Sequence, residues 1–106
     1  MNDYGLPDGT VQRLVDVFKK FPEIEEVILF GSRAKGTYKP GSDIDLALRG
    51  ERCSAELAWK LQGFINEELP IPYQVDIVDY RSLSNPRLKE NIDKVGVVFY
   101  RRSLSP

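Results

Sequence analysis

The segment DIDLAL, residues Asp43–Leu48, restricts the fold of this chain more than any other feature. Acidic and apolar residues alternate there, and successive side chains of an extended strand point to opposite faces of a sheet. The pattern predicts a strand with one apolar face and with Asp43 and Asp45 together on the other face. Two carboxylates about 4 Å apart repel by roughly 4 kcal/mol at an effective dielectric constant near 20, a cost that a divalent cation would reverse.

The residues before this strand are rich in glycine. The apolar run EEVILF, residues 25–30, predicts a buried strand, and GSRAKGTYKPGS, residues 31–42, predicts a loop with one helical turn starting near Ser32. Gly31 lets an anion approach the backbone without a Cβ in the way, and the N–H groups of the turn and the Ser32 hydroxyl can donate to it. Arg33 and Lys35 lie within reach of a polyphosphate tail, although plain solvated charge explains these two equally well. We therefore predict a triphosphate-binding loop.

The rest of the chain alternates between helical and strand patterns. The expected elements are a helix capped by Thr10 and running through Phe18, a helix over Ser54–Leu69, a strand over Tyr73–Val78, a helix from Pro86 to Val95 with Asn85 as its cap and Gly96 at its end, and a strand over Val97–Tyr100. This alternation predicts an α+β (α/β) fold, a mixed β-sheet packed with helices. With 106 residues we expect one domain over 1–106 and a flexible C-terminal tail over 101–106.

A third carboxylate, Asp76, lies on the predicted strand over 73–78. The chain has no histidine and one cysteine, so the usual zinc ligand sets are impossible and any metal must be bound by oxygen. Oxygen ligands select Mg²⁺ or Mn²⁺, which keep waters and also bind phosphate oxygens. Three aspartates around two such ions predict phosphoryl-type transfer. We expect no role for Cys53, because no histidine can activate it.

The net charge of the chain restricts the kinds of partner that we expect it to bind. Fifteen basic and sixteen acidic residues give a net charge of −1, so no overall positive field attracts nucleic acid or an anionic membrane. We expect no direct nucleic-acid binding. The N-terminal residues MNDYGLPDGT lack the basic start and apolar core of a signal peptide, and no apolar run reaches membrane-spanning length. We therefore expect no membrane association and a cytoplasmic location.

The motif GSRAKGTYKPGSDIDLAL, followed by YQVDIVD, resembles the signature of the DNA polymerase β-like nucleotidyltransferase superfamily. The resemblance covers a core motif over residues 25–78. The ends of the chain, including IDKVGVVFYRR, are similar to minimal nucleotidyltransferase (MNT) antitoxins that are encoded beside HEPN-domain toxins. The resemblance implies a single domain like the polymerase β palm.

The resemblance also implies residue roles. Gly31 and Ser32 would hold the nucleotide phosphates. Asp43 and Asp45 would bind two Mg²⁺ ions, with Mn²⁺ as a substitute, and Asp76 would complete the catalytic metal site and help to activate the acceptor hydroxyl.

The same resemblance implies a reaction and a partner. Antitoxins of this kind transfer AMP from ATP to a tyrosine of the HEPN ribonuclease, so we expect an Mg²⁺-dependent adenylyltransferase in a hetero-oligomer with its toxin. A non-catalytic, nucleotide-binding antitoxin that acts by contact alone is the alternative. The intact aspartate set favours the enzyme, because masking by contact requires no metal site.

Trp59 lies on the predicted helix over 54–69, roughly opposite the apolar stripe that includes Leu61 and Ile65. A large aromatic residue off the core stripe is typical of an interface. A ring folded flat onto the protein's own surface explains the position equally well.

Overall fold

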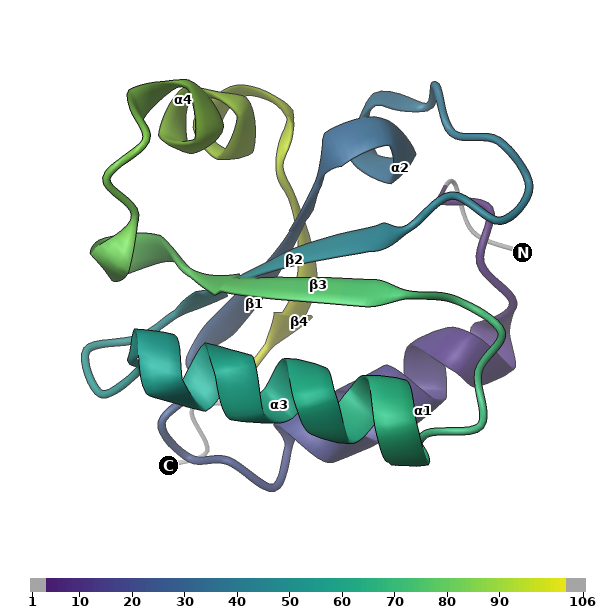
Figure 1. The fold of residues 1–106 in the computed structure, drawn as a ribbon, viewed down its shortest axis with the longest axis horizontal. Helices are drawn as coiled ribbons and strands as arrows, with labels where there is room; N and C mark the ends of the chain where they lie inside the picture. Colours follow the sequence, from purple (N-terminus) through teal and green to yellow (C-terminus); the bar gives the residue numbers. More distant parts are fainter. Residues whose placement is uncertain (1–3, 103–106) are drawn as a thin grey trace.

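The structure is a computed structural model, and it describes residues 4–102 (Figure 1). Helices and strands alternate along this part of the chain, as the sequence pattern predicts. In order, the elements are α1 (Asp8–Phe18), β1 (Glu26–Phe30), α2 (Gly31–Lys35), β2 (Ile44–Arg49), α3 (Ala55–Glu68), β3 (Val75–Asp79), the 3₁₀ turn η1 (Tyr80–Ser82), α4 (Pro86–Val95) and β4 (Val97–Arg101).

The four strands form one sheet in the order β3-β2-β1-β4. β1 pairs antiparallel with both β2 and β4, whereas β2 and β3 are parallel. The expectation of an α+β fold with a mixed sheet is therefore confirmed. The parallel register sets Asp45 of β2 beside Asp76 of β3, which brings together residues from two separate sequence motifs.

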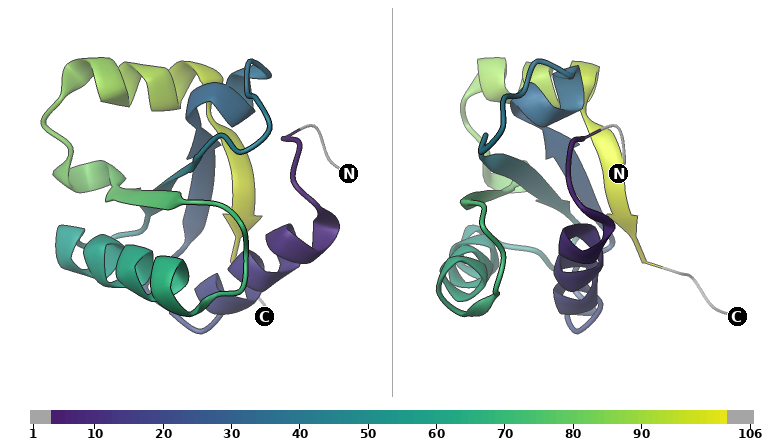
Figure 2. Two further views of the ribbon diagram at one scale, coloured as in Figure 1. Left: turned by 45° about the vertical axis from the view of Figure 1, so that its right-hand side comes forward. Right: turned by 90° about the vertical axis from the view of Figure 1, so that its right-hand side faces the viewer.

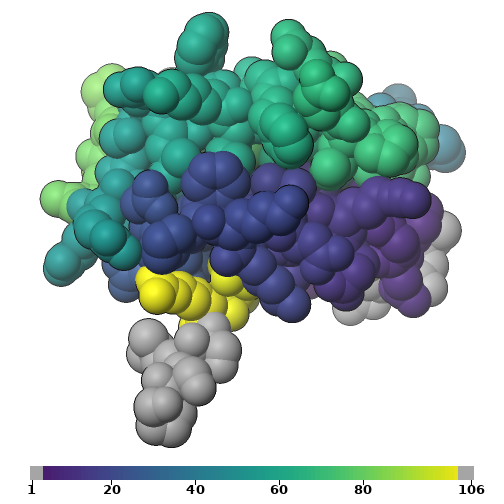
Figure 3. All heavy atoms as spheres, turned by 90° about the horizontal axis from the view of Figure 1, so that it is seen from below, coloured from purple at the N-terminus to yellow at the C-terminus, as the bar shows by residue number. Residues whose placement is uncertain are grey.

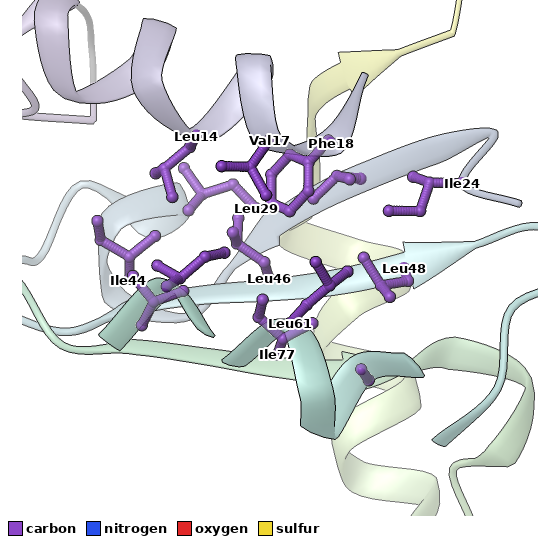
Figure 4. Close-up of a cluster of buried hydrophobic side chains, with 14 of the residues drawn as sticks. Leu14, Val17, Phe18, Ile24, Leu29, Ile44, Leu46, Leu48, Leu61 and Ile77 are labelled. Atoms are coloured by element: carbon purple, nitrogen blue, oxygen red, sulfur yellow. The ribbon is translucent and has the colours of Figure 1, made fainter. Parts of the chain in front are cut away.

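Helices cover both faces of the sheet (Figures 1 and 2). α1 and α3 lie next to each other on one face, and Figure 3 shows the molecule from that side. Their apolar residues enclose the main core with the sheet, as the close-up in Figure 4 shows for Leu14, Phe18, Leu46 and Leu61. α2 and α4 lie on the opposite face, where a smaller cluster packs. Its buried members are Ile28, Phe30, Ala47 and Ile92.

Local caps fix the starts of α3 and α4, and the cap of α4 is Asn85, as the sequence predicts. The Ser54 hydroxyl accepts a hydrogen bond from the Leu57 N–H at 3.1 Å at the start of α3. The Asn85 side chain accepts from the Arg87 N–H at 3.0 Å, with Pro86 in the first turn of α4. Within residues 4–102, no helix is long and apolar enough to cross a membrane.

Several boundary predictions are wrong. β2 starts at Ile44, so Asp43 precedes the strand, and β3 starts at Val75, two residues later than predicted. α1 starts at Asp8 with Pro7 as its cap, and Thr10 is a buried residue inside the helix. The helix starts this early because Pro7 is extended and its carbonyl accepts a hydrogen bond from the Thr10 N–H at 3.0 Å. The predicted tail over 101–106 includes Arg101, which instead belongs to β4 and forms a 2.6 Å ion pair with Glu26. The backbone N–H of Arg102 also donates to the Glu25 carbonyl. Residues 103–106 lie outside the described part of the chain.

Candidate active site

Asp45 and Asp76 share the sheet face that α2 and α4 cover, and Asp43, which is exposed and precedes β2, lies close enough to act on both electrostatically. Asp45 and Asp76 are register partners on adjacent strands, and Asp43 comes two residues before Asp45. Burial, with Asp76 and then Asp43 as further causes, raises the pKa of Asp45 from 3.8 to about 6. Burial and the charge of Asp43 also raise the pKa of Asp76. Burial and the neighbouring negative charges therefore make the ionisation of Asp45 and Asp76 less favourable.

Gly31 joins β1 to α2 directly against this acidic group. Its backbone has φ of +73°, a conformation that side-chain-bearing residues rarely adopt. A Cβ at this position would lie only 2.3 Å from Oδ2 of Asp45. Gly31, the first residue of the predicted phosphate loop, is therefore in contact with Asp45, and only glycine permits this close approach.

Ser32 and Lys35 occupy the helical turn expected after Gly31. Ser32 is half-buried as the second residue of α2, and Lys35 is exposed as its last residue. α2 is a single short turn that packs against both β1 and α4. Its start, with Ser32, therefore lies on the same face of the sheet as the aspartates.

Asn91 is a site residue that the sequence analysis missed. It lies on α4, and its Oδ1 accepts a hydrogen bond from the Gly31 N–H at 3.4 Å. The sequence of α4 shows only the apolar residues of the helix face that packs on the sheet. No pattern in it links Asn91 to a glycine 60 positions earlier. The pairing follows from the tertiary packing of α4 beside α2.

Arg33 is directed away from the acidic group. It is only 2% exposed, and its guanidinium donates to the carbonyl of Ser42 at 2.8 and 3.1 Å and to that of Tyr4 at 2.8 Å. The rings of Tyr38 and Tyr73 lie 5.2 and 5.0 Å from its Cζ. These contacts close the glycine-rich loop onto the N-terminal segment. The structure therefore does not bring Arg33 to the other predicted site residues, because carbonyl groups and aromatic rings engage its guanidinium.

Sequence and structure comparisons agree with this geometry. Residues 12–104 match the family described as "Polymerase beta, Nucleotidyltransferase". The chain belongs to this nucleotidyltransferase family. The match contains the glycine-rich loop and all three aspartates.

One curated relative of this nucleotidyltransferase domain is the "Probable protein adenylyltransferase MntA" of Haemophilus influenzae. It is 37% identical over 73 residues, which are 69% of this chain and 63% of the relative. The chain thus spans less than two thirds of that protein's length.

Solved structures share the fold. A chain of a toxin-antitoxin crystal structure with AMP-PNP has a TM-score of 0.70 at 24% identity, over 87% of this chain and 73% of the other. A chain of the toxin-antitoxin MntA-HepT has a TM-score of 0.67 at 20% identity, over 91% and 74%. A putative nucleotidyltransferase from Sulfolobus solfataricus has a TM-score of 0.57 at 26% identity, over 88% and 78%.

The carboxylates of this nucleotidyltransferase domain suit a metal ion that arrives with a phosphate ligand. Within residues 4–102, no three His, Cys, Asp or Glu side chains are grouped closely enough to hold an ion by themselves. Mg²⁺ is usually held by one or two carboxylates, with waters and substrate phosphates completing its shell. The mutual repulsion among Asp43, Asp45 and Asp76 is the condition that a cation relieves. The donor set therefore fits Mg²⁺ or Mn²⁺.

A cavity lies elsewhere in the domain. It measures about 640 Å³, and none of the predicted site residues lines it. Five arginines and four glutamates lie in its wall, so its charges nearly balance. Some are already engaged, since Arg101 binds Glu26 and Arg81 donates to the Glu51 carbonyl at 2.7 Å. This cavity lies at the opposite end of the sheet from Asp45 and Asp76.

Cys53 and Trp59 lie outside the acidic group. Burial, with nearby acidic residues as a further cause, raises the pKa of the Cys53 thiol to about 11, so the thiol stays protonated and is not a nucleophile at neutral pH. Trp59 is 74% exposed, so its ring does not lie flat on the protein's own surface.

Proposed function

We propose that this chain is an Mg²⁺-dependent adenylyltransferase that acts as an antitoxin, moving AMP from ATP to a tyrosine hydroxyl of a HEPN ribonuclease toxin. One observation carries the proposal: the glycine that opens the phosphate loop touches Asp45, which is paired in register with Asp76. Phosphate-binding and metal-binding groups thus meet at one point. The relative named as a probable protein adenylyltransferase supports the reaction, and the toxin-antitoxin structures with this fold support the partner.

In this proposal the residues act on one ATP molecule. Gly31 lets the triphosphate approach the backbone, the N–H and hydroxyl of Ser32 donate to it, and Asp43, Asp45 and Asp76 hold two Mg²⁺ ions. When bound, these ions neutralise phosphate charge and lower the pKa of the acceptor hydroxyl. We assign Lys35 to the outer end of the triphosphate and leave Arg33 to its carbonyl partners.

The transfer step balances as an in-line displacement. The tyrosine oxygen attacks the α-phosphorus of ATP, its bond to phosphorus forms, and the bond from phosphorus to the pyrophosphate oxygen breaks. The hydroxyl proton leaves to solvent or to Asp76. We propose a cytoplasmic location, where ATP is available as the substrate.

A labelling experiment tests the proposal. The purified protein is incubated with α-³²P-labelled ATP, MgCl₂ and the HEPN-domain protein encoded beside it, and the label is located by mass spectrometry. We expect one AMP on a tyrosine of the partner. Asp76→Asn should prevent labelling, whereas Asp16→Asn, which removes an exposed charge from α1, should not.

The outcomes separate the two kinds of antitoxin. If the partner ribonuclease is silenced without any label, and Asp76→Asn silences it equally well, the chain acts by contact and the proposed transfer is wrong. Labelling of this chain's own residues in place of the partner would also contradict the proposed acceptor.

A further inference from the structure

A groove lies on the β3 edge of the molecule, between α3 and the end of β3 with the η1 turn that follows it. It measures about 270 Å³, and Trp59, Asp79, Ser82 and Leu83 are among the residues that line it. None of the residues assigned above to nucleotide or metal binding belongs to its wall. The groove is therefore a separate feature.

The edge of β3 beside this groove is closed to strand pairing. The Asn66 side chain of α3 both accepts from the Val75 N–H and donates to the Val75 carbonyl, each at 2.9 Å. Gln62, one helical turn earlier, accepts from the Ile77 N–H at 2.7 Å. These amides occupy backbone groups that would otherwise pair with another strand. A partner at this edge must therefore bind through side chains.

Asp79, the last residue of β3, lacks a partner for one of its oxygens. The residue is 4% exposed, and its Oδ2 accepts from the Ser82 hydroxyl at 2.5 Å. Its Oδ1 is buried and has no hydrogen-bond partner within residues 4–102. Arg81, two positions later, donates instead to the Glu51 carbonyl. Buried polar groups nearly always have partners, so this carboxylate oxygen needs a donor that the described chain does not supply.

Trp59 stands beside the same groove. It lies on the side of α3 that carries Ala55 and Gln62, which also line the groove, and its ring is mostly exposed. Among side chains, the indole face is the strongest attractor of organic cations. The groove therefore combines an exposed tryptophan ring with a buried carboxylate that has one unpaired oxygen. Both groups can attract a cation.

We propose that this groove receives an arginine side chain of a partner protein. Its guanidinium donates to Oδ1 of Asp79 and packs against the ring of Trp59. Arginine fits better than lysine, because a planar guanidinium can stack on an aromatic face and donate hydrogen bonds at its edge at the same time. Because Oδ1 is closed to solvent, the wall of the groove must open to admit the guanidinium. The proposed function makes the toxin the natural donor of this arginine, but the site itself requires only a protein with an exposed arginine.

Trp59 is the only tryptophan of the chain, so its fluorescence reports binding without a label. The full-length protein is titrated with the blocked peptide acetyl-Gly-Arg-Gly-amide. The peptide in which citrulline replaces arginine serves as a probe of equal shape without the charge. We expect a saturable change in emission with the arginine peptide and at least about tenfold weaker binding of the citrulline peptide.

Variants locate the binding. Asp79→Asn, which keeps the shape of the side chain, should weaken arginine-peptide binding at least about tenfold, whereas Glu67→Gln on the exposed side of α3 should leave it unchanged. Ala55→Arg supplies a guanidinium from the chain itself and should block the peptide without a loss of fold, since Ala55 is exposed.

Equal binding of the citrulline peptide, or full binding by Asp79→Asn or Ala55→Arg, would overturn the arginine site. Failure here with AMP transfer to the partner intact would leave the proposed function standing. Arginine binding without AMP transfer would overturn only the proposed function.

Discussion

The two faces of β2 differ sharply although they belong to the same six residues. On one face Ile44, Leu46 and Leu48 are fully buried under α1 and α3. On the other face Asp45 stands half-buried next to Asp76 and in contact with Gly31. Burial of the first face stabilises the fold, whereas the like charges held together on the second face destabilise it.

The smaller hydrophobic cluster under α2 and α4 reflects the same division. Its buried members are Ile28, Phe30, Ala47 and Ile92, far fewer than in the main core. On this face Asp45 and Asp76 occupy sheet positions that apolar side chains would otherwise fill. The comparison implies that substitutions on the two faces should separate stability from activity.

The largest expected effect is on transfer by Asp45→Asn. Loss of a carboxylate that holds the ions should remove several kcal/mol of transition-state stabilisation, which corresponds to at least about a thousandfold slower labelling. The free energy of unfolding should stay the same or increase, because the substitution relieves repulsion from Asp76. Single-turnover kinetics with labelled ATP check the rate. A near-normal rate would refute the metal-binding assignment.

Leu46→Ala on the opposite face should do the reverse. Truncation of a fully buried leucine is expected to lower the free energy of unfolding by about 2–5 kcal/mol, as measured by urea denaturation. Val78→Ala, at a half-buried position on the acidic face, should cost clearly less. Under conditions in which Leu46→Ala is folded, this variant should still bind nucleotide. If the two variants lose equal stability, the two faces contribute alike and the comparison fails.

Gly31 and Gly36 of the glycine-rich loop are a matched pair for testing the contact with Asp45. Gly31 and Gly36 have φ of +73° and +80°, so alanine at either site should cost about 1–2 kcal/mol of backbone strain. A Cβ at Gly36 meets nothing within 4 Å, whereas at Gly31 it meets Asp45. Gly31→Ala should therefore lose more stability than Gly36→Ala, and only Gly31→Ala should slow transfer. Equal effects of both variants on transfer would show that the contact with Asp45 has no functional role.

The smallest effect is a pH dependence of stability in the presence of EDTA. The pKa of Asp45 is about 6 in the folded protein against 3.8 as its ordinary value, so the folded state binds more protons between these pH values. Stability from this group is therefore greatest below pH 4 and falls as pH rises to 6. Because the carboxyl is only partly buried, we expect a loss of about 1 kcal/mol after solvent screening.

Urea denaturation at pH 4 and pH 7 checks this effect. Asp45→Asn should lack the loss and become the more stable protein at pH 7. Added Mg²⁺ should narrow the difference between the two proteins. A wild type that gains stability relative to the variant over this pH range would contradict the electrostatic account.

Much of the fold could be predicted because its signals are local. The caps at Ser54 and Asn85 depend on residues within one helical turn, and the separation of Asp45 from Ile44 and Leu46 onto opposite faces follows from strand geometry. The start of α1 was mispredicted, because Thr10 is a good cap residue but Pro7 precedes it.

The remaining site contacts depend on residues far apart in the chain. Arg33 is buried because the Tyr4 carbonyl and the Tyr73 ring reach it from distant segments. Asn91 meets Gly31 only because α4 packs beside α2. No local pattern encodes either contact, and the unpaired oxygen of Asp79 is equally invisible in the sequence.

The central claim is that the acidic face of β2 binds nucleotide together with Mg²⁺. Calorimetric titration with a non-hydrolysable ATP analogue tests it without a partner protein. The account predicts saturable binding in Mg²⁺, loss of binding in EDTA, and loss in Asp45→Asn but not in Asp16→Asn. Binding of equal affinity in EDTA, or in Asp45→Asn, would contradict it.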